Sequence, residues 1–209
     1  VAIGAVDNDE AGPFAGQVNV FENIGGNWTQ IGAPINAEST SDRFGWSLCL
    51  SGDGSILAVG AIGNSANGFA AGHARVFKNI NGNWIQIGDD IDGDGPVDRF
   101  GASVSLSENG EILLVGAVGE IINVNNPGYA KVFRNISGNW IQIGETLYGE
   151  GNSDLFGADV SLSENGSILA VGAAFNDGNG TDAGQVRVFG GDPLSIPDQT
   201  IKKVTFYSQ

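Results

Sequence analysis

The chain has 209 residues, with 9 basic and 24 acidic side chains, so its formal net charge at neutral pH is −15. This charge argues against nucleic acids and anionic membranes as partners, because both would repel the protein. The longest apolar run, 112–118, is far shorter than the roughly 20 residues of a membrane-spanning helix, so we expect no membrane insertion. Hydrophobic residues make up 41% of the chain, which excludes disorder, and the 34 glycines indicate many turns.

A repeat of 56 residues organises the sequence. The apolar segments 1–5, 57–61, 113–117 and 169–173 are copies of one another, and each ends in Gly-Ala. Aromatic residues recur at the same step: Phe21, Phe77, Phe133 and Phe189; Trp28, Trp84 and Trp140; and the pairs Phe44-Gly45, Phe100-Gly101 and Phe156-Gly157. Each unit therefore solves the same packing problem. Because the chain starts at Val1 without Met, we expect this end to be processed or to lie within a longer chain.

The sequence of each 56-residue unit predicts four short strands. The first follows Phe-Gly, as in 102–106, and alternates apolar with small polar residues. It ends at Asp-Gly or Asn-Gly, which suits a tight hairpin. The second, as in 55–61, is almost continuously apolar and is predicted to be buried on both faces.

A loop rich in Gly and Asn follows, and its sequence differs between copies. The third strand, as in 72–77, alternates apolar residues with polar ones such as His73 and Arg75, and we interpret this polar side as a solvated surface. A turn leads to the fourth strand, as in 84–88. No segment has the pattern of a helix.

Four-stranded antiparallel units at a constant period predict an all-β fold, a β-propeller or a segment of one. The 209 residues correspond to about 3.7 such units, and the recognisable repeats occupy 1–189. The pattern fails after Phe189. We therefore predict that 190–209 is a linker with a tail strand, which either closes the last blade as a clasp or opens another domain.

Four motifs resemble a known repeat family: DRFGASVSL (98–106), LLVGA (113–117), GYAKVF (128–133) and WIQIG (140–144). They are similar to the FG-GAP-like repeat, found in the integrin α-chain propeller and in secreted proteins with a Trp-x-Gln strand. The resemblance covers 1–189 and implies seven blades as the usual number, extracellular placement, and roles in adhesion or matrix recognition. Integrin-type repeats carry a calcium loop between the first two strands, where this chain has only short turns, such as 51–54.

One acidic loop elsewhere in the repeat has the spacing of a calcium site. It places carboxylates at Asp90, Asp92, Asp94 and Asp98, with Gly95 at the turn. Calcium binds six to eight oxygen ligands, and acidic residues at alternate positions can surround it. The other repeats lack the full set, so the sequence predicts one Ca²⁺ ion at this loop, with a solvated acidic loop as the alternative.

Other recurring polar and aromatic residues have structural interpretations. The Asp two residues before each Phe-Gly (Asp42, Asp98, Asp154) is predicted to fix a turn by accepting backbone N–H bonds. The repeated Trp residues are predicted to pack between blades rather than to stack on sugars, because their spacing recurs with each unit. The single cysteine, Cys49, aligns with Ser105 and Ser161, and we interpret it as a small buried thiol.

Nothing in the sequence indicates a catalytic site. The only histidine, His73, has no evident orienting partner or nucleophile, and no phosphate loop, zinc spacing or catalytic elbow is present. We therefore expect that the chain is not an enzyme. Glycosylation sequons occur at Asn27, Asn135, Asn165 and Asn179, and they matter only in a eukaryotic secretory route.

These observations predict a non-catalytic, extracellular adhesion or recognition module, or a building block of a surface assembly. The expected partners are a protein or glycan ligand at the cell surface or matrix, further copies of the chain, or neighbouring domains. Ca²⁺ is the one cofactor expected. A lectin-like carbohydrate-binding propeller is the first alternative, and a carbohydrate-active hydrolase or lyase is the second.

Overall fold

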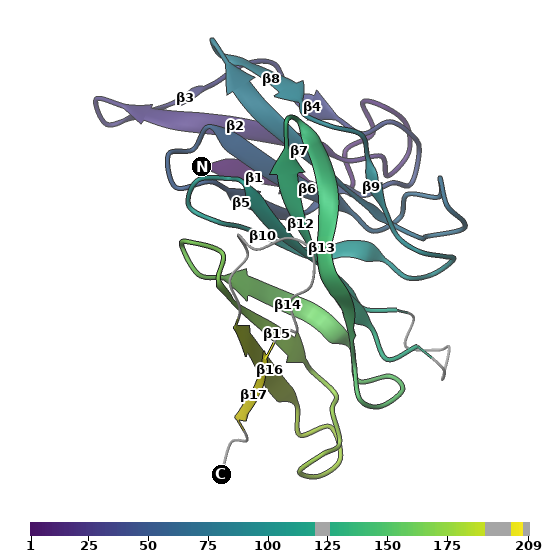
Figure 1. The fold of residues 1–209 in the computed structure, drawn as a ribbon. Coiled ribbons are helices and arrows are strands. Elements are labelled where there is room, and N and C mark those ends of the chain that lie inside the picture. Colours follow the sequence, from purple (N-terminus) through teal and green to yellow (C-terminus); the bar gives the residue numbers. More distant parts are fainter. Residues whose placement is uncertain (120–125, 191–201, 207–209) are drawn as a thin grey trace.

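The computed structural model describes residues 1–119, 126–190 and 202–206, and only the backbone of the last five. All regular elements in these residues are β-strands, so the described part contains no helix that could cross a membrane. The strands form four antiparallel sheets that follow one another in chain order (Figure 1). The fold is that of a β-propeller built from four-stranded blades, as predicted.

The first sheet contains β1 (Ala2–Ala5), β2 (Gln17–Ile24), β3 (Asn27–Gln30) and β4 (Ile35–Asn36). The second contains β5 (Phe44–Leu50), β6 (Ile56–Ala61), β7 (His73–Ile80), β8 (Asn83–Gln86) and β9 (Ile91–Asp92). The third contains β10 (Phe100–Leu106), β11 (Ile112–Ala117), β12 (Tyr129–Ile136) and β13 (Asn139–Tyr148). The fourth contains β14 (Phe156–Leu162), β15 (Ile168–Ala173), β16 (Gln185–Gly190) and β17 (Lys202–Phe206).

The outermost strand of a blade differs between sheets. In the second sheet β8 and β9 pair separately with β7, whereas in the third sheet the single ten-residue strand β13 pairs with β12, with one shift in register. In the fourth sheet β17 pairs with β16 in this outer position. Of the segment 190–209, predicted as linker and tail, residues 191–201 and 207–209 lie outside the described residues.

The hydrophobic cores lie between successive sheets. Val18 of the first sheet packs in one cluster with Phe44 and Leu57 of the second, and the next two pairs of sheets repeat this arrangement. All six residues of β6 are buried, as are all six of β11, because sheets cover both of their faces. The prediction of strands buried on both faces is thus confirmed for these two.

Backbone meets backbone where the sheets touch near the innermost strands. A Cβ added to Gly60 would lie 2.0 Å from the carbonyl oxygen of Gly101, and one added to Gly116 would lie 2.2 Å from that of Gly157. The Ser47 hydroxyl donates to the same Gly101 oxygen at 2.8 Å. Glycine is therefore required on the second strand by close approach of the next sheet.

Side chains also form hydrogen bonds across the junctions between sheets. The indole N–H groups of Trp84 and Trp140 donate to the carbonyl oxygens of Ile31 and Ile87, each at 3.1 Å and each in the preceding sheet. Their predicted packing between blades is confirmed. No preceding sheet among the described residues covers Trp28, and it is 59% exposed.

Cys49 makes a junction contact of the same type. Its sulfur accepts a hydrogen bond from the Leu106 backbone N–H at 3.2 Å, as the Ser105 hydroxyl does from Leu162 at 3.0 Å. The thiol is partly buried, and it replaces a junction hydroxyl.

The face of the fourth sheet that points away from the third sheet is exposed. Val186 is 51% exposed, whereas Ala74 and Ala130 at the equivalent positions are fully buried. A Cβ on Gly172 would meet no atom closer than 3.6 Å, in contrast to Gly60 and Gly116. Among the described residues no further sheet covers this face, so its strands are not buried on both sides as the sequence pattern predicted.

Candidate functional site

The four carboxylates of the predicted calcium loop point to different partners. Asp90 accepts a hydrogen bond from Gln86 Nε2 at 2.7 Å, and its Oδ1 lies 3.4 Å from Arg75 Nε. Asp94 pairs with Lys131. Asp92 lies in β9 and is exposed. Partial desolvation of its carboxylate and the charge of Asp90 raise its pKa.

Asp98 is the fourth predicted ligand, and its carboxylate stabilises the turn that precedes it. It accepts hydrogen bonds from the Gly95 backbone N–H at 2.9 Å and from the Tyr129 hydroxyl at 3.0 Å. Among the described residues, the oxygen atoms of these four carboxylates do not lie close enough together to bind one metal ion. Calcium at this loop stays a prediction, and thermal melting with and without EDTA checks it.

The recurring Asp before Phe-Gly anchors two chain segments. Asp42 accepts from the Ser39 backbone N–H at 2.9 Å and from Asn64 Nδ2 at 3.3 Å. Asp154 makes the same two bonds with Gly151 and Asn176. These carboxylates thus hold both the turn before the innermost strand and the loop after the second strand.

An acid and a base recur 37 residues apart in three repeats: Glu38 with Arg75, Asp94 with Lys131, and Glu150 with Arg187. The cationic side chains are largely buried. The Arg187 guanidinium lies 4.2 Å from the Phe156 ring centroid and 5.2 Å from that of Phe189. Stacking on aromatic faces and pairing with the acid offset the desolvation of the charge.

These pairs correct the interpretation of the third strand. Its polar side is not a solvated surface, because the segment that connects its sheet to the preceding sheet covers it. This segment carries the acid of each pair: Glu38, Asp94 or Glu150. The signal was present in the sequence as an acid and a base at a fixed separation in successive repeats. A search for recurring charge pairs finds it, whereas strand alternation alone does not.

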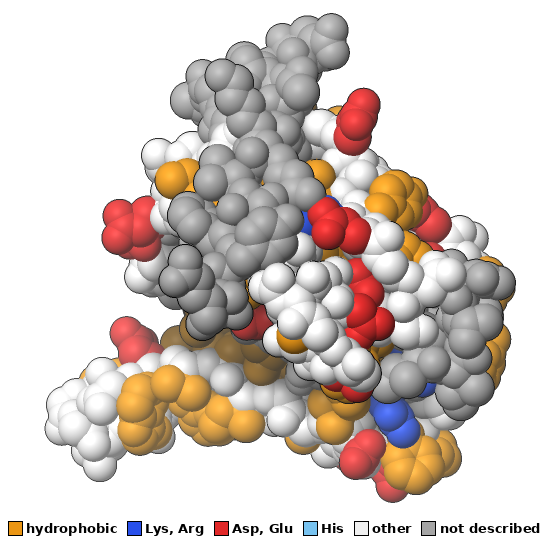
Figure 2. All heavy atoms as spheres, turned by 90° about the horizontal axis from the view of Figure 1, so that it is seen from below, with side chains coloured by type: hydrophobic (Ala, Val, Ile, Leu, Met, Phe, Trp, Pro, Cys, Tyr) orange, Lys and Arg blue, Asp and Glu red, His pale blue; other side chains and the backbone are white. Residues whose placement is uncertain are grey.

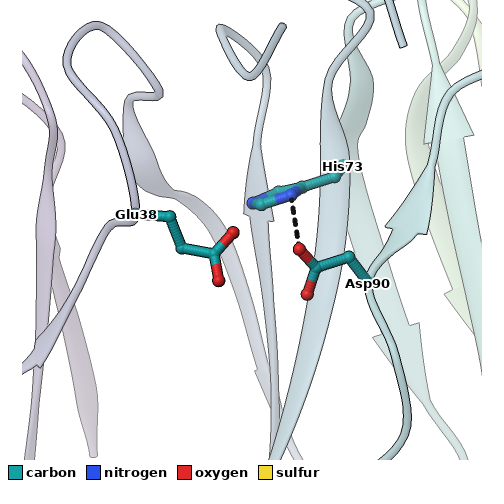
Figure 3. Close-up of side chains that lie close together, drawn as sticks. All are labelled: Glu38, His73 and Asp90. Carbon is teal, nitrogen blue, oxygen red and sulfur yellow. Dashed lines mark ion pairs between the residues drawn. The ribbon is translucent and has the colours of Figure 1, made fainter. Parts of the chain in front are cut away.

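Glu38, His73 and Asp90 form a group of three possible metal ligands in the described part of the chain. Figure 3 shows the carboxylates of Glu38 and Asp90 pointing toward each other beside the His73 ring. One donor atom from each residue lies within 4.8 Å of the other two. His73 Nδ1 lies 3.6 Å from Asp90 Oδ2, which is too long for a hydrogen bond.

The environment of His73 differs from that of its equivalents. Its side chain is only 1% exposed, and neither ring nitrogen has a hydrogen-bond partner. At the same position Gln17 donates to Asn36, Tyr129 donates to Asp98, and Gln185 donates to Glu150. The second repeat alone therefore places an unsatisfied polar ring against two carboxylates.

Burial sets the protonation state of this group. The pKa of His73 is lowered to about 4, because burial outweighs the opposing charge of Asp90 and the nearby charge of Arg75 acts in the same direction as burial. Burial also raises the pKa of Glu38, against the opposing effect of Arg75. At neutral pH the imidazole is neutral, so it offers a lone pair to a ligand, a metal or a proton.

A second candidate site is the set of loops after the second strands, 6–16, 62–72 and 174–184. Each has the same backbone hydrogen bonds, from Asn8 N to Ala5 O, from Gly16 N to Asn8 O, and their equivalents. The side chains on this common frame differ. Phe69 is 77% exposed, Phe14 is exposed in the first loop, and Asp182 is exposed in the last.

Comparison with protein families finds one repeat family, described as the FG-GAP repeat, which matches residues 36–77 and 149–189. Both matched segments are FG-GAP-like repeats. The two matched segments each run from the end of one blade to the third strand of the next, and the intervening unit keeps the same register. Comparison with curated protein sequences finds no match.

Two solved structures resemble the fold of this chain. The periplasmic gluconolactonase of Pseudomonas aeruginosa, PpgL, matches with a TM-score of 0.56 and 17% identity, over 90% of this chain and 50% of its own. The tricorn protease matches with a TM-score of 0.45 and 9% identity, over 92% of this chain and 19% of its own. The chain therefore spans half the length of the gluconolactonase.

The gluconolactonase match corrects one prediction. We expected that the chain is not an enzyme, because the sequence shows no recognisable catalytic site. The match overturns that expectation, because a protein of the same fold is an enzyme. The repeat pattern therefore gives no ground for excluding catalysis.

Proposed function

We propose that this FG-GAP chain is an extracellular recognition module that binds a protein ligand through the loops after its second strands. The observation that carries the proposal is the common backbone frame of these loops, which presents different exposed side chains in each repeat. Loops held by a rigid scaffold are the usual location of binding residues.

The composition of these loops indicates the type of ligand. Phe14 and Phe69 provide exposed aromatic anchors of the kind found at binding hot spots. Exposed acidic residues lie in the first and last of the three loops: Asp7, Asp9, Glu10, Asp177 and Asp182. In the view of Figure 2 acidic side chains outnumber basic ones, consistent with the net charge of −15. A basic protein surface with apolar pockets fits this chemistry, and its association would be accelerated at low salt.

The test measures binding of the chain to immobilised matrix and cell-surface proteins, with a glycan array alongside. A Phe69→Ser variant should lose affinity by about 30-fold or more if Phe69 is a hot spot. Ile85→Ser is the control, since Ile85 is also exposed but lies on β8, outside the loops. Binding of glycans but no protein would favour the lectin alternative. Protein binding that Phe69→Ser leaves intact would contradict the proposal.

A carbohydrate-active hydrolase is the second candidate function. Two observations favour it: the fold is shared with a gluconolactonase, and neutral His73 lies beside two carboxylates. Hydrolysis of gluconolactone by the chain, compared with a His73→Gln variant, tests this candidate. A rate equal to the uncatalysed rate would exclude this substrate.

A further inference from the structure

Glu38, His73 and Asp90 are the one group in the described part of the chain with three metal-ligating residues whose donor atoms lie within 4.8 Å of one another (Figure 3). We propose that this group binds a divalent first-row transition cation, with Zn²⁺ as its representative. The inference does not depend on the recognition function, because it concerns different side chains from those of the loops.

The first argument is the missing partner of His73. A buried polar group normally has a hydrogen-bond partner, and a side chain that lacks one indicates a ligand or an ion. Gln17, Tyr129 and Gln185 each have a partner at the equivalent position, so the fold itself does not force the deficit. A cation bonded to one ring nitrogen of His73 supplies the missing interaction.

The second argument is how the carboxylate oxygens are used. Arg75 contacts Oε1 of Glu38 at 3.2 Å and Oδ1 of Asp90 at 3.4 Å, which is one oxygen of each residue. The other oxygen of Asp90, Oδ2, lies 3.6 Å from His73 Nδ1. Two ligands of a tetrahedral zinc ion with bonds near 2.0–2.1 Å are about 3.3 Å apart. The Asp90–His73 spacing is therefore close to that of a ligand pair.

The third argument is the support around the ligands. Arg75 is held by Gln86, which accepts its Nε–H at 2.8 Å, and it lies over the rings of Phe44 and Phe77. Gln86 also donates to Asp90 at 2.7 Å. Arg75 and Gln86 thus orient the carboxylates, as the outer partners of metal ligands commonly do. Arg75 compensates one of the two carboxylate charges and leaves a net negative charge that attracts a cation.

The ligand types indicate which cation binds. One imidazole nitrogen with two carboxylates suits zinc and its first-row neighbours, whereas calcium and magnesium prefer oxygen ligands alone. The Glu38 side chain is 45% exposed, which gives the ion an entrance and leaves space for water ligands. This site overlaps the predicted calcium loop at Asp90 alone, because Glu38 and His73 lie outside that loop.

The experiment titrates ZnCl₂ into the metal-free chain by calorimetry, with any affinity tag removed. The proposal expects one high-affinity Zn²⁺ per chain and at least a tenfold loss of affinity in His73→Gln and Glu38→Gln. Gln occurs naturally at the position of His73 in two repeats, so the first variant should fold. Glu150→Gln is the matched control, because Glu150 is the equivalent of Glu38 in a repeat without histidine. Its affinity should equal that of the original chain.

A second measurement needs no variant. The chain has a single histidine, so its imidazole ¹⁵N NMR signals report on His73 alone. A stoichiometric shift of one ring nitrogen on addition of Zn²⁺ supports the proposal. No shift at saturating Zn²⁺ would overturn it, as would Zn²⁺ binding that Asp92→Asn abolishes and His73→Gln leaves unchanged.

Discussion

Gly60 provides the most direct test of how the blades are joined. In a Gly60→Ala variant the new methyl group would lie 2.0 Å from the Gly101 carbonyl oxygen and 2.5 Å from the Ser47 hydroxyl, so the second and third sheets must separate locally. Overpacking of this type costs about 1–3 kcal/mol. Loss of the Ser47–Gly101 hydrogen bond adds about 1 kcal/mol. The gain from removing a strand glycine is only about 0.5–1 kcal/mol.

The net expectation for Gly60→Ala is a loss of about 1–3.5 kcal/mol in the free energy of unfolding. Gly172→Ala is the matched control, because it occupies the same position in the fourth sheet and its added Cβ meets nothing closer than 3.6 Å. It should be neutral or slightly stabilising, by up to about 1 kcal/mol. Urea denaturation followed by tryptophan fluorescence measures both. Equal effects of the two substitutions would refute the argument that the next sheet imposes glycine.

Two further substitutions test the other contacts between blades. Trp140→Phe removes the indole hydrogen bond to Ile87 and should destabilise the chain by about 1 kcal/mol, whereas Trp28→Phe, at an exposed indole, should have no measurable effect in the same thermal melts. Arg187→Met removes the contacts of the guanidinium with Phe156 and with the Tyr148 carbonyl oxygen, 2.7 Å away, and should lower the free energy of unfolding by about 2–3 kcal/mol in urea. An Arg187→Met variant as stable as the original chain would show that the buried charge makes no net contribution.

The repeat makes the fold predictable from the sequence. The alternation in 102–106 and the apolar run in 55–61 indicate β10 and β6 nearly to the residue, because each position recurs with the same burial requirement. The short strands β4 and β9 escape prediction, since two-residue pairings leave no periodic pattern. The exposure of Ile168 and Val186 is not predictable either, because the equivalent residues in other repeats are buried. The difference is that no further sheet among the described residues covers the fourth sheet.

The candidate site is much less predictable. The polar equivalents of His73 predict a surface residue, yet His73 is buried by Glu38 and Asp90, which approach from 35 residues before it in the chain and 17 after it. Alternation along one strand shows which side a residue faces but not what covers that side. The spacing of Asp90, Asp92, Asp94 and Asp98 is visible in the sequence, but their separate partners depend on the packing of three different strands and turns.

The constant register of the junctions has a consequence for how such proteins change size. Each bond across a junction joins positions that keep a fixed offset, as Ser47 with Gly101 and Ser103 with Gly157 do. Duplication or deletion of one whole unit by recombination would therefore create a junction of the same kind and leave the others untouched. A change in length by one whole blade would therefore keep the partner positions at each junction, whereas a shift of a few residues would displace the partners at the junction that it affects.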